Sequence, residues 1–334
     1  MVTFAQFGAG RIGRVHAGNV ARHPAARLKY IVDPQAELAR ALAAATGALV
    51  ADIETPFADL DVDAVLIASS ADTHADLILR AVAAKKAIFC EKPLMRGADQ
   101  ARDCVRAIRG SGVPLFLAFQ RRFDPSFAAL KRRLAAGEIG RPEIMILTSR
   151  DPEAPPLEVI GRSDGLFRET MIHDFDVARW LLAEEPTEVY AVGACLTDPR
   201  IAAIGAIDTA VVTLKTRSGA MCVINNSWRA SYGYDQRVEV HGAGGLLQVG
   251  NRPATSVAKW DRDGVSSDAP RYFFTERYVD AYRFELDAFI AALINGSAVS
   301  PDEEDGLRAL VLADCAQESF ASGRPVAVPA DLGI

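Results

Sequence analysis

The chain has 334 residues, of which half are hydrophobic, 24% are charged and 7% are aromatic, and its formal net charge is −6. This balance is typical of a globular α/β protein and excludes a disordered or collagen-like chain. A mildly acidic chain lacks the basic surplus that displaces counterions from nucleic acid, so we expect no nucleic-acid partner. The length predicts about two domains of ~150 residues each.

The cysteine pattern and the start of the chain bear on location. Five cysteines are scattered without a CxxC pair, which predicts neither a disulfide framework nor a metal site and favours a reducing compartment. The first ten residues lack the features of a signal peptide, and no apolar stretch reaches the ~20 residues that a membrane span needs. We therefore expect a cytoplasmic protein with no membrane segment.

Short β-rich runs alternate with Ala-rich helical patterns over the first part of the chain. Strands are expected at residues 3–7, 28–32, 64–68, 87–90 and 114–118, and helices at residues 11–22, 34–46, 73–84 and 98–109. This alternation is typical of βαβ units on a parallel sheet. The prediction is an α/β protein whose N-terminal domain, residues 1–120, is a Rossmann domain with a doubly wound parallel sheet.

Longer alternating segments follow residue 124. After a helix at 125–136, strands are expected at 143–148, 188–194, 210–214, 220–225, 237–240 and 256–260, and helical patterns at 279–294 and 303–322 close the chain. They predict a C-terminal α+β domain, residues 121–334, with a large, mostly antiparallel open sheet. We place the boundary near residues 119–124 and expect the last strand or helix to return to the first domain. Strands such as AVVTLKT are apolar on both faces, so we expect sheet-to-sheet association into a homo-oligomer, a dimer or a tetramer.

A glycine-rich turn follows the first predicted strand. Gly8, Gly10 and Gly13 have the spacing that allows a tight turn, a close approach of the backbone to a pyrophosphate, and packing of the next helix on the strand. Asp33 ends the second strand, where a carboxylate takes the two ribose hydroxyls and repels a 2′-phosphate. Capping of the next helix is the alternative role for Asp33. The pattern predicts a dinucleotide site that favours NAD over NADP.

Two further segments carry acid–base chemistry. Lys92, in the segment Glu91-Lys92-Pro93, stands at a strand end, where it can bind a substrate hydroxyl and assist proton transfer. Glu169, His173 and Asp176 are spaced by four and three residues, which would place them on one face of a helix. A histidine beside carboxylates suits a general base that accepts an alcohol proton. Each segment, taken alone, is also compatible with a solvated turn or a surface ion pair.

Four segments together resemble one family of enzymes. They are AQFGAGRIGRVHAGN, FCEKPL, FQRRFDPSF and MIHDFDVARWLL, and they span most of the chain. The chain resembles the glucose-fructose oxidoreductase, inositol dehydrogenase and rhizopine catabolism family of NAD(P)-dependent oxidoreductases. The RRFD and IHDFD segments are most similar to its bacterial inositol 2-dehydrogenase branch.

The resemblance implies roles for particular residues. The implied catalytic residues are Lys92, His173 and Glu169. The implied cofactor-binding residues are Gly8, Gly10, Arg11, Ile12, Gly13, Asp33, Ser69, His74, Glu91 and Lys92. The implied substrate-binding residues are Lys92, Arg121, Ser149, Asp151, Glu169, His173, Asp176 and Tyr234. No metal is implied.

The chain also departs from the family pattern. Glu169 stands where the family has an aspartate, and one extra methylene displaces a positioned carboxylate by more than about an ångström. Ser149 and Asp151 lie in a segment where the family tends to have a histidine and an asparagine. These differences leave open which inositol isomer or sugar is the substrate.

The resulting hypothesis is an NAD-dependent dehydrogenase that oxidises a secondary hydroxyl of a cyclic polyol or sugar by hydride transfer to C4 of the nicotinamide. Two alternatives remain. One is a hydride-shuttling glycosidase that retains NAD without net redox change, and the other is a non-catalytic NAD-binding regulator. The physiological direction and dual use of NAD and NADP stay open.

Overall fold

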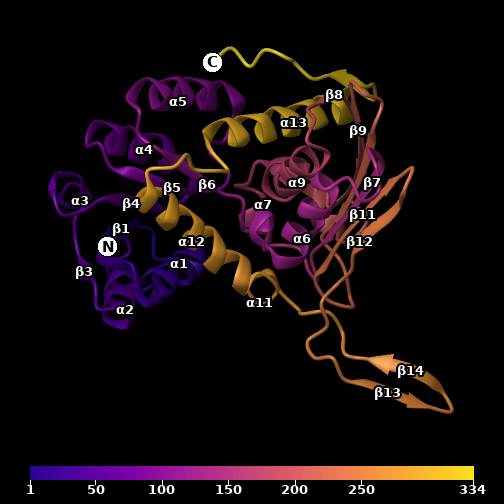
Figure 1. Ribbon diagram of the computed structural model, residues 1–334, viewed down its shortest axis with the longest axis horizontal. Helices are drawn as coiled ribbons and strands as arrows, with labels where there is room; N and C mark the ends of the chain where they lie inside the picture. Colours follow the sequence, from indigo (N-terminus) through magenta and orange to yellow (C-terminus); the bar gives the residue numbers. More distant parts are fainter. The chain divides into compact units, whose positions relative to one another are not determined.

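The computed structural model describes all residues, 1–334, and divides them into two compact units (Figure 1). Unit 1 contains Met1–Phe123, Asp280–Leu310 and Asp331–Ile334, and unit 2 contains Asp124–Val279 and Val311–Ala330. The boundary between Phe123 and Asp124 lies within the expected 119–124, close to the end of the 1–120 range, and residues 280–310 and 331–334 of the expected 121–334 domain return to unit 1. No helix combines the length and the apolar character that crossing a membrane requires.

Unit 1 is built on a six-stranded parallel sheet with the order β3-β2-β1-β4-β5-β6. The strands are β1 (Val2–Phe7), β2 (Ala26–Val32), β3 (Leu49–Val50), β4 (Ala64–Ile67), β5 (Ala87–Glu91) and β6 (Leu115–Ala118). Every residue of β4, β5 and β6 is buried, as a sheet with helices on both faces requires. The order reverses beside β1, and parallel sheets bind ligands at such a point.

Helices cover both faces of this sheet (Figure 1). They are α1 (Arg11–Arg22), α2 (Ala36–Thr46), α3 (Thr55–Ala58), α4 (His74–Ala83) and α5 (Ala98–Ser111), with the 3₁₀ turns η1 (Ala71–Thr73) and η2 (Gln120–Phe123). The returning helix α12 (Val279–Asn295) buries Leu286, Phe289 and Ile290 in the same core as the first strand. The Phe289 ring lies 6.1 Å from that of Phe4 and 5.6 Å from that of Phe89. This aromatic packing is the physical reason that residues 280–310 belong to unit 1.

Unit 2 contains a seven-stranded sheet with the order β12-β11-β7-β10-β9-β8-β15. Its strands are β7 (Pro142–Arg150), β8 (Pro186–Ala194), β9 (Thr209–Thr216), β10 (Met221–Ser227), β11 (Asp235–Gly242), β12 (Gly245–Val249) and β15 (Val326–Ala327). Only β7 and β10 pair in parallel. The predicted fold class, a Rossmann sheet followed by a mostly antiparallel open sheet, is confirmed.

Helices pack on one face of this sheet, with α9 against β7 and α6 against β12. The helices of unit 2 are α6 (Pro125–Ala135), α7 (Leu157–Ile160), α8 (Gly165–Glu169), α9 (Ile172–Leu182), α10 (Pro199–Ala203) and α11 (Phe274–Arg277), and α13 (Glu303–Ser322) ends in this unit. The opposite face, called the outer face below, bears seven apolar side chains that are 38% to 49% exposed: Ile144, Ile146, Tyr190, Val192, Val211, Met221 and Leu246.

One predicted strand lies elsewhere. Residues 256–260 do not join the large sheet, because β13 (Ala258–Asp261) pairs only with β14 (Gly264–Ser267). Both strands are fully exposed, and Figure 1 shows this hairpin projecting from unit 2. The strand prediction is correct locally, but the segment has no buried face to add to the sheet.

Candidate functional site

The glycine turn after β1 has the geometry that a dinucleotide site needs. Gly8 has φ +102°, and a side chain there would meet the Ala68 carbonyl oxygen at 2.4 Å. A Cβ on Gly13 would lie 2.3 Å from the carbonyl oxygen of Gly8, so the start of α1 approaches the turn closely. At Gly10 a Cβ would have no neighbour within 4 Å. The turn is therefore closed toward the protein and open on its outer side.

The first turn of α1 presents backbone N–H groups on that open side. Gly10 is the N-cap of α1, and no side chain caps the helix. Free N–H groups and the positive end of the helix dipole favour an anion at such a position. This position therefore suits the pyrophosphate of a dinucleotide.

A buried amide holds the turn in place. Gln6, in β1, is completely buried, and its Nε2 donates hydrogen bonds of 2.8 Å to the carbonyl oxygens of both Gly8 and Gly13. Sequence reasoning missed this residue, although a glutamine inside an otherwise apolar buried strand is a signal for such a role.

Asp33 ends β2 and contacts the same turn. One carboxylate oxygen accepts the backbone N–H of Ala9 at 2.7 Å, and the other accepts that of Gln35 at 2.8 Å. The structure therefore gives Asp33 a link to the glycine turn as well as a place at the start of α2. Because its strand lies next to β1, Asp33 stands at the position from which a carboxylate can bind a ribose.

The ends of β4 and β5 continue the same edge of the sheet. Ser69 follows β4, and its hydroxyl bonds that of Thr73 at 2.6 Å. Lys92 follows β5, is half-buried, and is joined to Pro93 by a cis peptide bond. His74 is buried, with Nδ1 2.9 Å from the Pro93 carbonyl oxygen and Nε2 3.3 Å from that of Ser69. Its imidazole thus supports the two segments predicted to contact the cofactor.

Three predicted site residues of unit 1, His74, Glu91 and Arg121, are buried. Burial lowers the pKa of the His74 imidazole, which favours its neutral form. The Glu91 carboxylate faces the imidazole of His16 at 2.6 Å. Arg121 lies in η2 and is only 3% exposed. Arg11 and Ile12 lie in the first turn of α1, after the glycine turn.

The helix expected to carry Glu169, His173 and Asp176 is interrupted. α8 ends at Glu169 and α9 begins at Ile172, because the N–H groups of Thr170 and Met171 both donate to the Leu166 carbonyl. Glu169 and His173 therefore lie on two separate helices, and the prediction that one continuous helix carries both on the same face is wrong. His173 and Asp176 keep their three-residue spacing on α9.

A tryptophan fixes this interruption. The indole Nε1 of Trp228, just after β10, donates to the Thr170 hydroxyl at 3.0 Å. Neither residue was predicted to belong to the site. Next to it, Asp174 accepts a hydrogen bond of 3.0 Å from Asn226 of β10. These two contacts tie the segment that carries Glu169 and His173 to the sheet.

The remaining predicted residues of unit 2 lie around the ends of β7 and β11. Ser149 is buried and accepts a hydrogen bond of 2.9 Å from Gln236. The backbone N–H of Asp151 donates a hydrogen bond of 2.9 Å to the carbonyl oxygen of Ser227. The Tyr234 ring is buried edge-on to that of Tyr278 at 6.0 Å. Asp176 is completely buried, with Arg179 at 4.0 Å.

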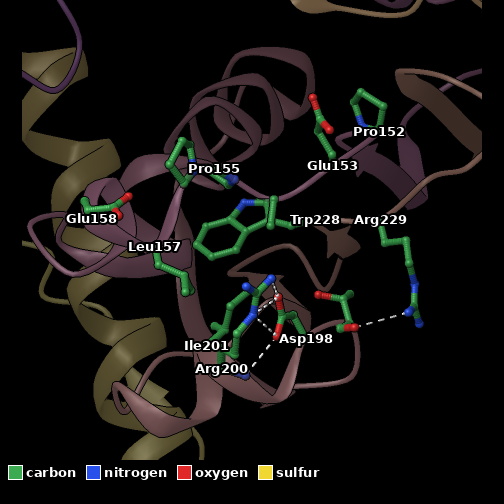
Figure 2. Close-up of a pocket in the computed structure, with 13 residues that line it drawn as sticks. Pro152, Glu153, Pro155, Leu157, Glu158, Asp198, Arg200, Ile201, Trp228 and Arg229 are labelled. Atoms are coloured by element: carbon green, nitrogen blue, oxygen red, sulfur yellow. Dashed lines mark hydrogen bonds and ion pairs between the residues drawn. The ribbon is translucent and has the colours of Figure 1, made fainter.

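Two cavities of unit 2 share the Trp228 side chain. A cavity of ≈ 340 Å³ includes Glu169, Thr170 and Ser163 in its wall. A second cavity, of ≈ 550 Å³, is shown in Figure 2, where Trp228 lies between Pro155 and Leu157 on one side and the paired Asp198 and Arg200 on the other. Glu169 thus lines the first cavity, whose wall is mostly apolar, whereas Asp198 and Arg200 belong to the neighbouring one. None of the other predicted substrate-binding residues lines either cavity.

Comparison with known proteins defines the class. Residues 2–119 match the oxidoreductase family with an NAD-binding Rossmann fold, and residues 127–248 match the GFO/IDH/MocA C-terminal domain. The fold and the glycine turn agree with this match, so the chain is an NAD-dependent dehydrogenase, and the cofactor prediction is confirmed.

The particular family follows from relatives that match the whole chain. An inositol 2-dehydrogenase of Rhizobium meliloti is 45% identical over 98% of this chain and 99% of its own length. The structure of a myo-inositol dehydrogenase from Corynebacterium glutamicum has a TM-score of 0.95 at 40% identity, covering 99% of this chain and 100% of that one. A scyllo-inositol dehydrogenase from Lactobacillus casei, with bound NAD(H) and scyllo-inositol, has a TM-score of 0.92 at 27% identity, covering 98% and 99%. The chain belongs to the GFO/IDH/MocA family, as its sequence motifs predicted.

Proposed function

We propose that this dehydrogenase oxidises a secondary hydroxyl of an inositol. The observation that carries the proposal is the row of groups at the carboxyl edge of the parallel sheet, where Asp33, the glycine turn and Lys92 follow β2, β1 and β5. The relatives named above, which are inositol dehydrogenases, supply the substrate class.

Each group has a stated task in this proposal. Bound NAD supplies the hydride acceptor at C4 of its nicotinamide. His173 accepts the proton of the substrate hydroxyl, and the Lys92 ammonium donates a hydrogen bond to the same oxygen and lowers the cost of removing that proton. The Glu169 carboxylate supports the imidazolium that forms on His173.

The isomer preference depends on a few residues of unit 2. Glu169 differs from the aspartate of the family pattern, and Ser149 and Asp151 lie in a segment where the pattern has a histidine and an asparagine. Arg121, Asp176 and Tyr234 complete the proposed substrate contacts. Because each of these groups recognises the direction of a particular hydroxyl, the balance between myo- and scyllo-inositol is set here.

The test measures NADH formation with a panel of myo-inositol, scyllo-inositol, glucose and other sugars. Efficient NAD reduction with one inositol isomer supports the proposal. Glycoside cleavage without NADH points to the hydride-shuttling glycosidase, and NAD binding without any turnover points to the regulator. Either result would overturn the proposal that this protein oxidises a polyol.

We further propose that the protein is a cytoplasmic homo-oligomer, a dimer or a tetramer. The outer face of unit 2 supports the oligomer, because seven partly exposed apolar side chains on one sheet form a patch of the kind that partner chains cover. All five cysteines are free thiols, which supports a reducing compartment.

A further inference from the structure

Three buried titratable side chains meet inside unit 1. They are His16 of α1, Glu91 at the end of β5, and Glu285 of α12, and their exposed fractions are 0%, 8% and 0%. Their nitrogen and carboxylate oxygen atoms all lie within 4.8 Å of one another. None of the three elements is a neighbour of the others in the sequence, so the cluster is a product of the fold.

The His16–Glu91 pair is a strong hydrogen bond inside an aromatic enclosure. The distance from Nε2 to Oε1 is 2.6 Å. The rings of Phe89 and Tyr282 stand edge-on to the imidazole at 5.1 and 5.7 Å. One carboxylate therefore has a well-defined partner in a region of low polarity.

Glu285 is in a different state. Neither of its carboxyl oxygens has a hydrogen-bond partner. An ionised carboxylate without partners is very costly in a protein interior, especially beside a second carboxylate. Burial first, and then the charge of Glu91, raise the pKa of Glu285 well above its ordinary value. The group facing it from β5 is Glu91, and the group facing it from α1 is His16.

The cluster is connected to Lys92 through Glu91. While Oε1 of Glu91 bonds His16, Oε2 accepts the backbone N–H of Lys92 at 3.2 Å. Both oxygens of Glu91 are thus used, one to hold the carboxylate in place and one to hold the backbone of the proposed catalytic lysine. A second negative charge beside Glu91 would push this carboxylate away from both partners.

We propose that Glu285 is a positioning residue that stays protonated, so that Glu91 is the only carboxylate of the cluster and keeps the backbone of Lys92 in place. This inference rests on the role proposed for Lys92. Glu285 itself touches neither substrate nor cofactor in this scheme. A neutral side chain of the same shape should therefore replace it, whereas truncation should not.

The first experiment tests the protonated state without using activity. Thermal unfolding of the wild type and of Glu285→Gln is measured from about pH 5 to about pH 9. A raised pKa means that the stabilisation from the bound proton is complete below the unfolded-state pKa and is lost as the pH rises through the folded-state pKa. The folded-to-unfolded ratio of the wild type should fall relative to the variant by up to about tenfold per pH unit. Asp280→Asn, on the same helix, is the control and should follow the pH dependence of the wild type, because Asp280 is partly exposed and pairs with Arg283, whose charge is constant over this range.

Two outcomes would overturn the protonated state. One is an identical pH dependence in Glu285→Gln and the wild type. The other is a stoichiometric divalent metal in the purified wild type that is absent from Glu285→Gln, because a cation would then take the place of the proton.

The second experiment tests positioning. Glu285→Ala should lower kcat by about tenfold or more with an unchanged KM for NAD, and Glu285→Gln should restore kcat. Equal kcat losses in both variants, or no loss in either, would overturn the positioning role. If Glu285→Ala does not fold, a kcat of Glu285→Gln tenfold below that of the wild type overturns it. If the wild type oxidises no polyol, the proposed function fails while the unfolding experiment still decides the state of Glu285.

Discussion

At the scale of single residues, His173 and Lys92 are expected to dominate turnover. Replacing either with alanine removes a proton acceptor or a charged hydrogen-bond donor that acts on the substrate oxygen. We expect kcat to fall by about 10²- to 10⁴-fold, while the NAD dissociation constant stays within about twofold. Steady-state kinetics and NAD titration by fluorescence measure the two quantities.

The controls for these variants are Lys259→Ala and Arg262→Ala, whose side chains are exposed in the hairpin of unit 2. Their kcat should equal that of the wild type. Near-normal turnover in His173→Ala or Lys92→Ala would show that the proton is accepted elsewhere.

Asp33 is expected to decide cofactor choice. Asp33→Ser removes a carboxylate that accepts two backbone N–H groups and repels a 2′-phosphate. Hydrogen bonds to a charged group contribute about 1.5–3 kcal/mol, so the ratio of kcat/KM for NAD over NADP should fall by about tenfold or more. Asp52→Ser is the control, since Asp52 also accepts two backbone N–H groups but lies in an exposed turn. An unchanged cofactor ratio in Asp33→Ser would exclude the ribose contact.

At the scale of elements, the approach of α1 to β1 depends on one helical glycine. In Gly13→Ala the new methyl group would lie 2.3 Å from the Gly8 carbonyl oxygen, so the helix must shift away from the turn. We expect NAD affinity to fall by more than about tenfold, since helix displacement moves the N–H groups that bind the pyrophosphate.

The control is Gly110→Ala in α5, where a Cβ meets no neighbour within 4 Å. This change should stabilise the protein by about 0.5–1 kcal/mol, because alanine loses less backbone entropy in a helix. Thermal unfolding and NAD titration of both variants measure the contrast. Equal NAD affinity in the two variants would show that the glycine contact does not position the cofactor site.

The sequence predicted the elements whose signals are local and missed those that depend on distant partners. The glycine turn and α1 follow from a contiguous pattern, and the observed helix has the predicted bounds. At the break after Glu169, the Thr170 hydroxyl accepts a hydrogen bond from Trp228, which is 58 residues away. A return of the last strand or helix to the first domain is expected from the sequence, but which residues return depends on distant contacts such as that of Phe289 in α12 with the ring of Phe4. No local pattern contains such contacts.

At the scale of the whole molecule, the outer face of unit 2 raises the question of assembly. Its apolar residues are in register across neighbouring strands: Met221 pairs with Ile144, and Val192 pairs with Val211. Alternation along each strand places these side chains opposite the buried face. A continuous apolar patch of this kind, which water would otherwise cover, favours association with the same face of a second chain.

The outer face can be tested by adding a charge at its centre. Val211→Glu would bury an unpaired carboxylate in a sheet-to-sheet contact, which weakens association. The loss of the valine's apolar contact area weakens association further. We expect light scattering to show the mass of a single chain for this variant and that of a dimer or tetramer for the wild type. Val265→Glu, on the exposed strand β14, adds the same charge outside the outer face and should leave the oligomer intact. If Val211→Glu keeps the wild-type mass while Val265→Glu dissociates, the projecting hairpin, and not the outer face, holds the chains together.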